Sequence, residues 1–412
     1  MIGTRVRTLS MGALGVVLLL AAARGARAED APPPTPPPPS APAQVVPPSS
    51  PAADRRVVEW AAPVDPAAPA PASRATAPCA PPPCAPVLPC APCTPCDEPR
   101  RGPLEWRDEF VFAHARLTLT PLSPDTLGCG RSSVHVGFSW ANSFGWRQDT
   151  TGENPAIRYF LVDGETRTLD VTATRGISKD VDLSLRLPLK WRGAGVLDGF
   201  IDAFHESTSG FGIQDNLRKD FYDDKYRVNG LLTDGSPFNA DAEKGTGLGD
   251  LEAAAKWRFR DGGRDGASFS LVGRVTAPTG TAPFDVGGVN AGLQVVGAQR
   301  LGRAFDVFAG VGGTWFGETQ YDGITYEQWR GHGFLALEWR PARTWSLIVE
   351  TDAGTALVSN VQKYDNQQWY LNLGAKIDLG PATRLELGFL ENLQSQQTTA
   401  DFGVVFGIEH RW

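Results

Sequence analysis

Residues 181–191 read VDLSLRLPLKW, and this stretch decides the fold. Every odd-numbered position is apolar, whereas the even-numbered positions include Asp182, Arg186 and Lys190. Successive side chains of a β-strand point to opposite faces, so the stretch predicts a strand with one apolar and one charged face. That alternation is typical of a transmembrane β-barrel wall, which meets lipid on the outside and encloses a polar interior.

The same alternation returns along the chain, clearly at 249–259, 369–379 and 402–412. It predicts an all-β fold, a transmembrane antiparallel up-and-down barrel of about 12 strands within residues 132–412. The expected strands are 132–143, 157–174, 180–192, 248–260, 267–278, 290–301, 304–316, 330–340, 344–356, 367–379, 382–391 and 400–412.

The lengths of the connections agree with this fold. Those at 301–304, 341–344 and 380–382 are short, whereas the intervening ones are longer, with 193–247 the longest. Short periplasmic turns that alternate with long extracellular loops are expected of outer-membrane barrels. A soluble β-barrel or sandwich also alternates, but it would not place charges on one face of nearly every strand.

The end of the chain has the pattern expected of a barrel insertion signal. A terminal aromatic residue closes an amphipathic last strand, whose signal residues are Phe402, Val404, Phe406, Ile408 and Trp412. We therefore expect outer-membrane lipid and the barrel insertion machinery as partners, in the outer membrane of a Gram-negative bacterium.

The N-terminal region has three parts. Residues 1–28 combine Arg5 and Arg7 with an apolar run and a small-residue cleavage site, which predicts a signal peptide. Residues 29–103 are rich in Pro, Ala and Cys and are expected to be a disordered periplasmic segment. Residues 104–131 are a lead-in segment to the barrel.

The six cysteines favour disulfides over a metal site. Five lie in the tail and one stands just before the barrel: Cys79, Cys84, Cys90, Cys93, Cys96 and Cys129. The periplasm is oxidising, and the proline-rich spacing without nearby histidine does not suit tetrahedral zinc. The spacing does not define the pairing. We expect no cofactor or metal, and the net charge of −7 gives no indication of nucleic-acid binding.

The loop at 193–247 contains LDGFIDAFH, whose apolar residues recur at helical spacing. Such a helix suits an extracellular cap, or alternatively a plug or constriction of the lumen. The plug candidates are Leu197, Asp198, Phe200, Ile201, Phe204 and His205. We expect no catalysis, because the serines near His205 do not follow the pattern of barrel lipases.

The charged faces of the strands predict a charged lumen. Its expected members are Asp182, Arg186, Lys190, Glu252, Lys256, Arg258, Arg274, Glu338, Arg340, Glu350 and Lys376. These side chains either pair across the lumen or line a small aqueous path, and pairing avoids the cost of unpartnered charges.

Three blocks carry a family resemblance: DGET at 163–166, LDGFIDAFH, and the region around Asp215, Arg218 and Tyr226. They resemble the domain-of-unknown-function 3187 family of proteobacterial outer-membrane proteins, over residues 117–412. The resemblance implies a barrel in the envelope and no established activity. The Pro- and Cys-rich tail departs from it.

Two functions fit this organisation. The first is a small-solute channel or transporter, indicated by the charged lumen. The second is a closed barrel that anchors the tail, which would reach a periplasmic or peptidoglycan partner. A lipid-modifying enzyme is a third, less favoured, alternative.

Overall fold

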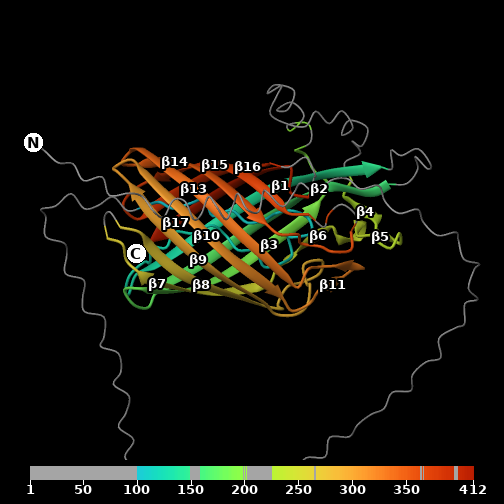
Figure 1. Cartoon of the computed structure of the whole chain (residues 1–412), viewed down its shortest axis with the longest axis horizontal. Coiled ribbons are helices and arrows are strands. Elements are labelled where there is room, and N and C mark those ends of the chain that lie inside the picture. The colour runs from blue at the N-terminus through green and yellow to red at the C-terminus, as the bar shows by residue number, and fades with distance from the viewer. Residues whose placement is uncertain are drawn as a thin grey trace, which may run out of the picture. The chain divides into compact units, whose positions relative to one another are not determined.

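The computed structural model describes residues 100–148, 158–197, 199, 201, 225–263, 266–361, 364, 366–393 and 398–412. Twelve antiparallel strands close a barrel (Figure 1). They are β1 (Ser132–Gln148), β2 (Arg158–Gly176), β3 (Val181–Gly193), β7 (Leu251–Arg260), β8 (Ser268–Ala277), β9 (Asn290–Leu301), β10 (Phe305–Phe316), β13 (Trp329–Ala342), β14 (Trp345–Gly354), β15 (Gln368–Asp378), β16 (Thr383–Asn392) and β17 (Phe402–Arg411).

The barrel closes where the first and last strands meet. β1 pairs with β17 in unbroken register from Ser133 opposite Arg411 to Asn142 opposite Phe402. The predicted all-β antiparallel barrel is therefore confirmed, and each expected strand range overlaps one of these twelve barrel strands.

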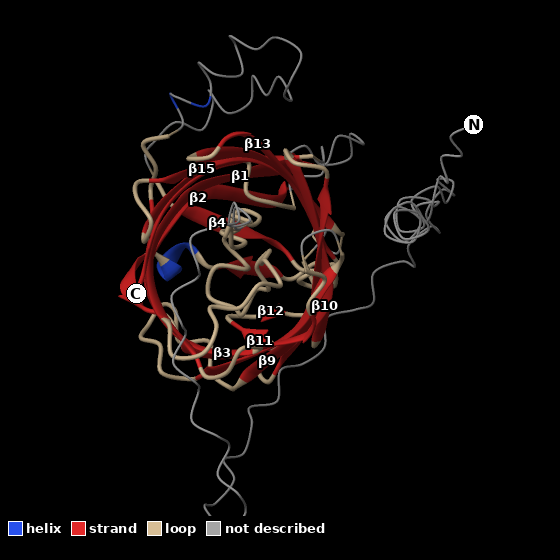
Figure 2. Ribbon diagram, turned by 90° about the vertical axis from the view of Figure 1, so that its left-hand side faces the viewer, coloured by secondary structure: helices blue, strands red, loops and turns tan. Residues whose placement is uncertain are grey.

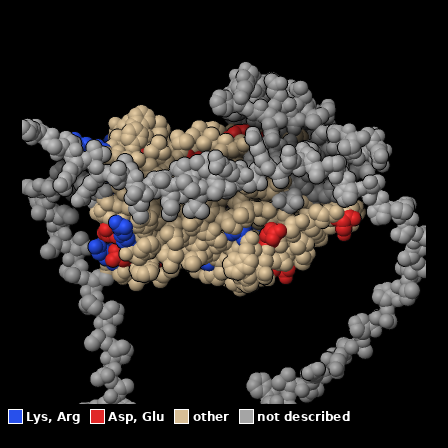
Figure 3. Space-filling view, in the orientation of Figure 1, with Lys and Arg blue, Asp and Glu red and all other residues tan. Residues whose placement is uncertain are grey.

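Strand β3 shows why this sequence forms a barrel wall. Leu183, Leu185 and Leu187 are 47%, 50% and 49% exposed, whereas Asp182 and Arg186 are 2% and 6% exposed. The apolar residues therefore face outward and the charges face the lumen. The described part of the outer surface in Figure 3 is accordingly mostly uncharged, with charged side chains at its left-hand end and a few more in the middle and towards the right.

The two ends of the barrel differ. At the turn end the strands are joined by short connections, and β1 begins and β17 finishes there. The loop end carries the longer connections, which contain short elements. These are β4 (Arg227–Leu231), β5 (Pro237–Asn239), η2 (Asp241–Glu243), β6 (Gly245–Leu248), β11 (Gln320–Tyr321) and β12 (Ile324–Thr325).

The predicted helical loop lies largely outside the described residues. Its described part extends the wall, since β4 pairs with the beginning of β2 and β6 pairs with β3. Gly199 and Ile201 are helical, and the Ile201 N–H donates to the Leu197 carbonyl at 2.8 Å. No helix in the described part of the chain is long and apolar enough to cross a membrane.

Residues 100–127, which precede β1, contact the inner faces of strands around the barrel; we call them the plug. The plug contains no helix or strand. Viewed along the barrel axis, loop segments run through the interior of the ring of strands (Figure 2). The expected tail included 100–103, yet Arg100 and Arg101 are already buried among lumen side chains.

Candidate functional site: the plugged lumen

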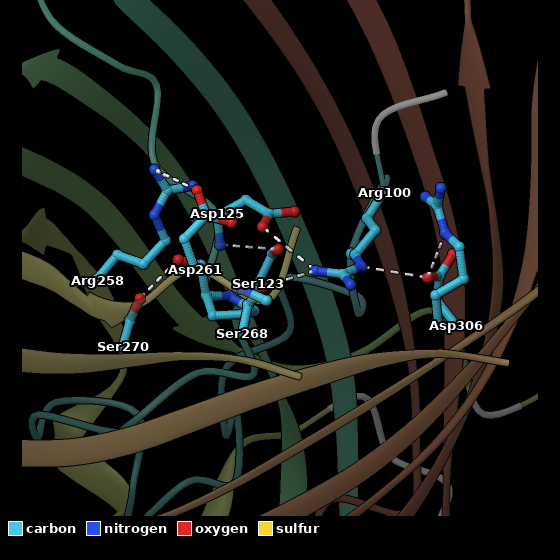
Figure 4. A network of polar contacts seen from close by, with 12 residues as sticks. Arg100, Ser123, Asp125, Arg258, Asp261, Ser268, Ser270 and Asp306 are labelled. Carbon is cyan, nitrogen blue, oxygen red and sulfur yellow. Dashed lines mark hydrogen bonds and ion pairs between the residues drawn. The ribbon is translucent and has the colours of Figure 1, made fainter. Parts of the chain in front are cut away.

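The plug rises from the turn end to the loop end and returns. Its ascending arm begins at Arg100 and Arg101, and a reversal at 111–116 leads to a descending arm that reaches Leu127. At the turn end Arg100 links the two arms to the wall (Figure 4). Its guanidinium donates to Asp306 of β10 at 3.2 Å and to Asp125 of the descending arm at 3.5 Å.

Carboxylates of the wall accept hydrogen bonds from backbone N–H groups of the plug. An extended segment without a strand partner must bond its N–H groups elsewhere, and carboxyl oxygens are good acceptors. The pairs are Arg101 with Glu338 at 3.2 Å, Gly102 with Glu338 at 3.4 Å, Leu104 with Glu350 at 3.0 Å, Glu105 with Glu386 at 2.8 Å and Leu127 with Asp182 at 3.1 Å. The wall thus holds the plug through carboxylates on four strands, β3, β13, β14 and β16, and not through a shared ladder of backbone hydrogen bonds.

Glu252 of β7 forms ion pairs with three arginine side chains. Arg107 of the plug donates to both of its oxygens, at 2.9 and 3.2 Å. Arg274 of β8 also donates to Glu252, and Arg186 of β3 lies 3.7 Å from it. This carboxylate is 3% exposed, so its charge is strongly coupled to the arginines around it. Glu252 therefore joins the plug to three neighbouring wall strands.

Near the top of the plug, Glu109 and His114 contact β1 and β2. Ser139 donates to Glu109 at 2.6 Å, and Thr168 donates to the other carboxylate oxygen at 3.1 Å. His114 Nε2 lies 3.1 Å from Glu109, and Lys190 of β3 donates to the His114 carbonyl. These polar groups are buried but partnered, as a stable docked segment requires.

The tip of the plug is apolar. Phe110, Val111 and Phe112 are 2%, 3% and 4% exposed, within a cluster of buried residues from β2 and the loops of the loop end. Tyr326 of the loop after β12 donates to the Phe112 carbonyl at 3.1 Å. Burial raises the pKa of Tyr226, another member of this cluster, to about 12. The tip and the loops together close the loop end.

Leucine side chains of the plug pack closely against glycines of the wall. A Cβ at Gly374 would lie 2.7 Å from the Leu104 side chain, and one at Gly312 would lie 2.7 Å from Leu119. Only glycine leaves room for contacts this close. The wall is therefore shaped to receive the plug.

The plug leaves a cavity of about 430 Å³, lined at the turn end by both plug arms and by β1, β2, β3, β7, β8, β15 and β17. Its lining includes Arg186, Glu252 and Arg274 together with His135 and Asp170. The size is that of a typical small-molecule site, but the walls are unusually polar for one.

The sequence profile of the family described as protein of unknown function (DUF3187) matches residues 94–412. The chain belongs to this family. Residues of the plug thus fall within the family match. A comparison with curated proteins finds no match to the chain.

Solved structures align with this DUF3187 chain at low identity. The COG4313 outer membrane channel from Pseudomonas putida F1 is 13% identical, with a TM-score of 0.49, and the alignment covers 72% of this chain and 100% of that one. The Pseudomonas putida toluene transporter TodX is 8% identical, with a TM-score of 0.34 and coverage of 68% and 88%. The NanC porin is 6% identical, with a TM-score of 0.38 and coverage of 68% and 98%.

The DGET block of this DUF3187 chain joins the loop, the wall and the plug. A Cβ at Gly164 would lie 2.5 Å from the Tyr226 ring. Glu165 accepts hydrogen bonds from the Leu197 N–H at 2.6 Å and from Trp140 Nε1 at 2.5 Å. Thr166 donates to the Glu109 carbonyl of the plug at 2.6 Å. Three consecutive residues thus fix three different parts of the molecule.

The predicted loop plug and the observed plug are different segments. Of the loop candidates, only Leu197 and Ile201 are described, and Asp198, Phe200, Phe204 and His205 lie outside the described residues. The Leu197 N–H donates a hydrogen bond to the Glu165 side chain. Glu165 lies on the outward face of β2, together with Leu169 and Val171. The start of this loop therefore lies against the outside of the wall, and sequence reasoning did not assign 100–127 to the lumen.

All eleven predicted lumen charges carry side chains on the inward face, and each has a partner. The contacts not yet described are Lys256 with Asp182 at 3.6 Å, Arg258 with Asp180 at 2.8 Å, Arg340 with Asp306 at 2.8 Å and Lys376 with Glu386 at 2.8 Å. Other partners of the eleven residues belong to the plug, such as Arg107 with Glu252 and Leu104 with Glu350, and the pairing prediction did not include them.

The C-terminal residues Phe406, Ile408 and Trp412 are 47%, 42% and 60% exposed on the outer face, and Phe402 is buried. Their role in insertion stays a prediction.

Cys129 is disulfide-bonded. The described residues contain no cluster of three or more potential metal ligands.

Proposed function

We propose that this protein is a gated channel for small solutes in the outer membrane of a Gram-negative bacterium, with residues 100–127 as the gate. The observation that carries the proposal is that the wall is complete without the plug. In the described part of the chain, no backbone-to-backbone hydrogen bond joins residues 100–127 to a wall strand. The plug can therefore move without opening the strand ladder.

The dimensions of the barrel support passage of a solute. Side chains fill the interior of a barrel of about 8 strands, and larger barrels enclose cavities or channels. Here the additional space is taken by a segment attached at one end, and the wall beneath it is polar. Displacement of the plug would expose a charged, hydrated path.

The outward apolar face supports the membrane location and the contact with lipid. Exposed tryptophans lie near both ends, with Trp257, Trp339 and Trp412 towards the turn end and Trp329 towards the loop end. Such residues favour the membrane–water interfaces. We place the turn end in the periplasm, as the short connections favour. The insertion machinery and a periplasmic or peptidoglycan partner of the tail remain proposals.

A second candidate is a permanently closed barrel that anchors the tail. It is favoured by the apolar cluster at the loop end, which seals the lumen with buried aromatic side chains. A static anchor needs no movable plug, however, and the polar attachment of the plug arms favours the channel.

The test compares the refolded full chain with a variant lacking residues 100–127 in planar bilayers. Heat-dependent mobility on electrophoresis confirms that each barrel has folded. The channel predicts rare openings in the full chain and sustained conductance in the variant. A folded variant that stays silent would favour the anchor.

A further inference from the structure

A groove lies on the outer face of the barrel at the turn end, across β1, β2 and β3. Its outward side chains lie in two rows that follow the register of the strands. The row nearer the turn end contains Trp412, Ser132, Arg175 and Leu183, and the next row contains Val134, Ala173 and Leu185. Ser132 and Ala173 are small and have larger residues on both sides, so they form the floor of a hollow of about 380 Å³.

Arg175 brings a positive charge to this groove. It is exposed, it forms no ion pair with any described residue, and the described residues that line the groove include no Asp or Glu. Its Nη1 donates to Ser132 Oγ at 2.7 Å, which holds the guanidinium beside the floor. A guanidinium carries more N–H donors than this one contact uses. Because a charge beside lipid is costly without a partner, the groove favours an anionic group at Arg175.

The other side chains of the groove are arranged in the order of a membrane leaflet. Trp412, in the row nearer the turn end, is 60% exposed, and tryptophan favours the membrane–water interface. Leu185 and Ala173 lie one row further along the barrel axis, and Leu185 is 50% exposed. A cation at the interface with an aliphatic surface beyond it matches the phosphate and the acyl chain of a phospholipid.

We propose that this groove binds one glycerophospholipid of the leaflet at the turn end. Its phosphate pairs with the guanidinium of Arg175, whose planar fork suits two phosphate oxygens, and an acyl chain lies along Ala173 and Leu185. The site is on the outer face, so it depends on the membrane location of the barrel but not on the plug or on conduction.

A lipid at this site also contacts both ends of the strand order. Ser132 of β1 and Trp412 exchange two backbone hydrogen bonds of 3.0 Å where the barrel closes, and both residues line the groove. A ligand that binds only the folded protein raises its thermal stability. The bound phospholipid therefore stabilises the closed barrel at the contact between its first and last strands.

The test is native mass spectrometry of the refolded full chain in detergent, titrated with phosphatidylglycerol. A diacylglycerol with the same acyl chains, which lacks the phosphate, is titrated separately. We expect the diacylglycerol to bind about tenfold more weakly, and Arg175→Gln to weaken binding of phosphatidylglycerol by about the same factor, the loss of one charged hydrogen-bonding partner. Ala173→Phe fills the floor without changing the charge and should weaken binding of both lipids.

The matched control is Arg260→Gln. Arg260 is also exposed at the turn end, but it lies 5.8 Å from the centre of the Phe269 ring, outside the groove. Its replacement should leave binding unchanged. Heat-dependent mobility on electrophoresis confirms that each variant barrel has folded, and phosphatidylglycerol should raise the melting temperature of the unmodified chain more than that of Arg175→Gln.

Phosphatidylglycerol binding with this ranking of lipids and variants supports the inference. Absence of binding overturns it, as does equal binding of the diacylglycerol, which would indicate apolar contact alone. An equal loss in Arg260→Gln would indicate a general effect of surface charge and also overturns it. A two-chain species that excludes lipid and disappears in Ala173→Phe would assign the groove to a second copy instead. A barrel that binds phosphatidylglycerol as expected but never conducts retains this site and removes the channel, so the two proposals fail separately.

Discussion

Replacement of Glu252 by Gln should loosen the plug while leaving the strand ladder intact. The substitution keeps the shape of the side chain but removes the charge that three guanidinium groups share. Loss of one partner from a buried ion pair costs about 3–5 kcal/mol. Arg107 is the one plug residue among the three arginines, so about a third of this cost, 1–1.7 kcal/mol, bears on plug docking.

Each 1.4 kcal/mol changes an equilibrium about tenfold, so the open probability of Glu252→Gln in planar bilayers should rise about tenfold. Arg107→Gln removes the same contact from the plug side and should act in the same direction. Electrophoretic heat modifiability shows whether each variant barrel has folded before conductance is recorded.

Glu409→Gln is the matched control, because Glu409 lines the same cavity but pairs at 2.7 Å with Arg411 of its own strand. Its open probability should remain near that of the unmodified chain. Equal opening in Glu409→Gln and Glu252→Gln, or no change in Glu252→Gln and Arg107→Gln, would refute a specific latch at Glu252.

Three further predictions concern the loop end. Gly164→Ala places a Cβ 2.5 Å from the Tyr226 ring and should destabilise the protein by about 1–3 kcal/mol in denaturant titration. Phe112→Ala should lower the free energy of unfolding by about 3–5 kcal/mol, because it empties a buried site. Val311 is 61% exposed on the outer face, so Val311→Ala should lower it much less. The pKa of Tyr226 is raised from 10.0 to about 12, so the unfolded state loses its proton first and stability falls as pH rises through that interval. The free energy of unfolding should fall by about 3 kcal/mol over that interval, and Tyr226→Phe should abolish this fall. Identical profiles of unfolding free energy against pH for the two proteins would contradict the prediction.

The barrel could be predicted because its physics is local and periodic. In residues 181–191 each side chain faces either the outer surface or the lumen according to its parity, so the sequence records the environment directly. Short turns at one end and long loops at the other then define the order of the strands. No knowledge of distant contacts is needed for either inference.

The plug could not be predicted in the same way, because its contacts are distant and aperiodic. Arg107 and Glu252 are 145 residues apart, and Leu104 and Glu350 are 246 apart. The nearest signals were the charged pair Arg100-Arg101 at the end of a proline-rich tail and the apolar FVFA at 110–113. The apolar run is unusual for a solvated linker, but neither signal specifies the lumen as the place where these residues are buried.

The plug is held by two different kinds of contact, and this difference predicts the order of opening. The arms are attached by ion pairs and hydrogen bonds, whereas the tip buries Phe110, Val111 and Phe112. Burial of such side chains stabilises docking by about 1.5–3 kcal/mol each, or roughly 5–9 kcal/mol together. Spontaneous withdrawal of the whole plug should therefore be rare, and the arms should loosen first. We expect small, brief openings in Glu252→Gln and wider ones when Phe112→Ala is added, because the tip must also leave the loop cluster. Openings of one size in the single and double variants would show that the tip does not limit the width of the path.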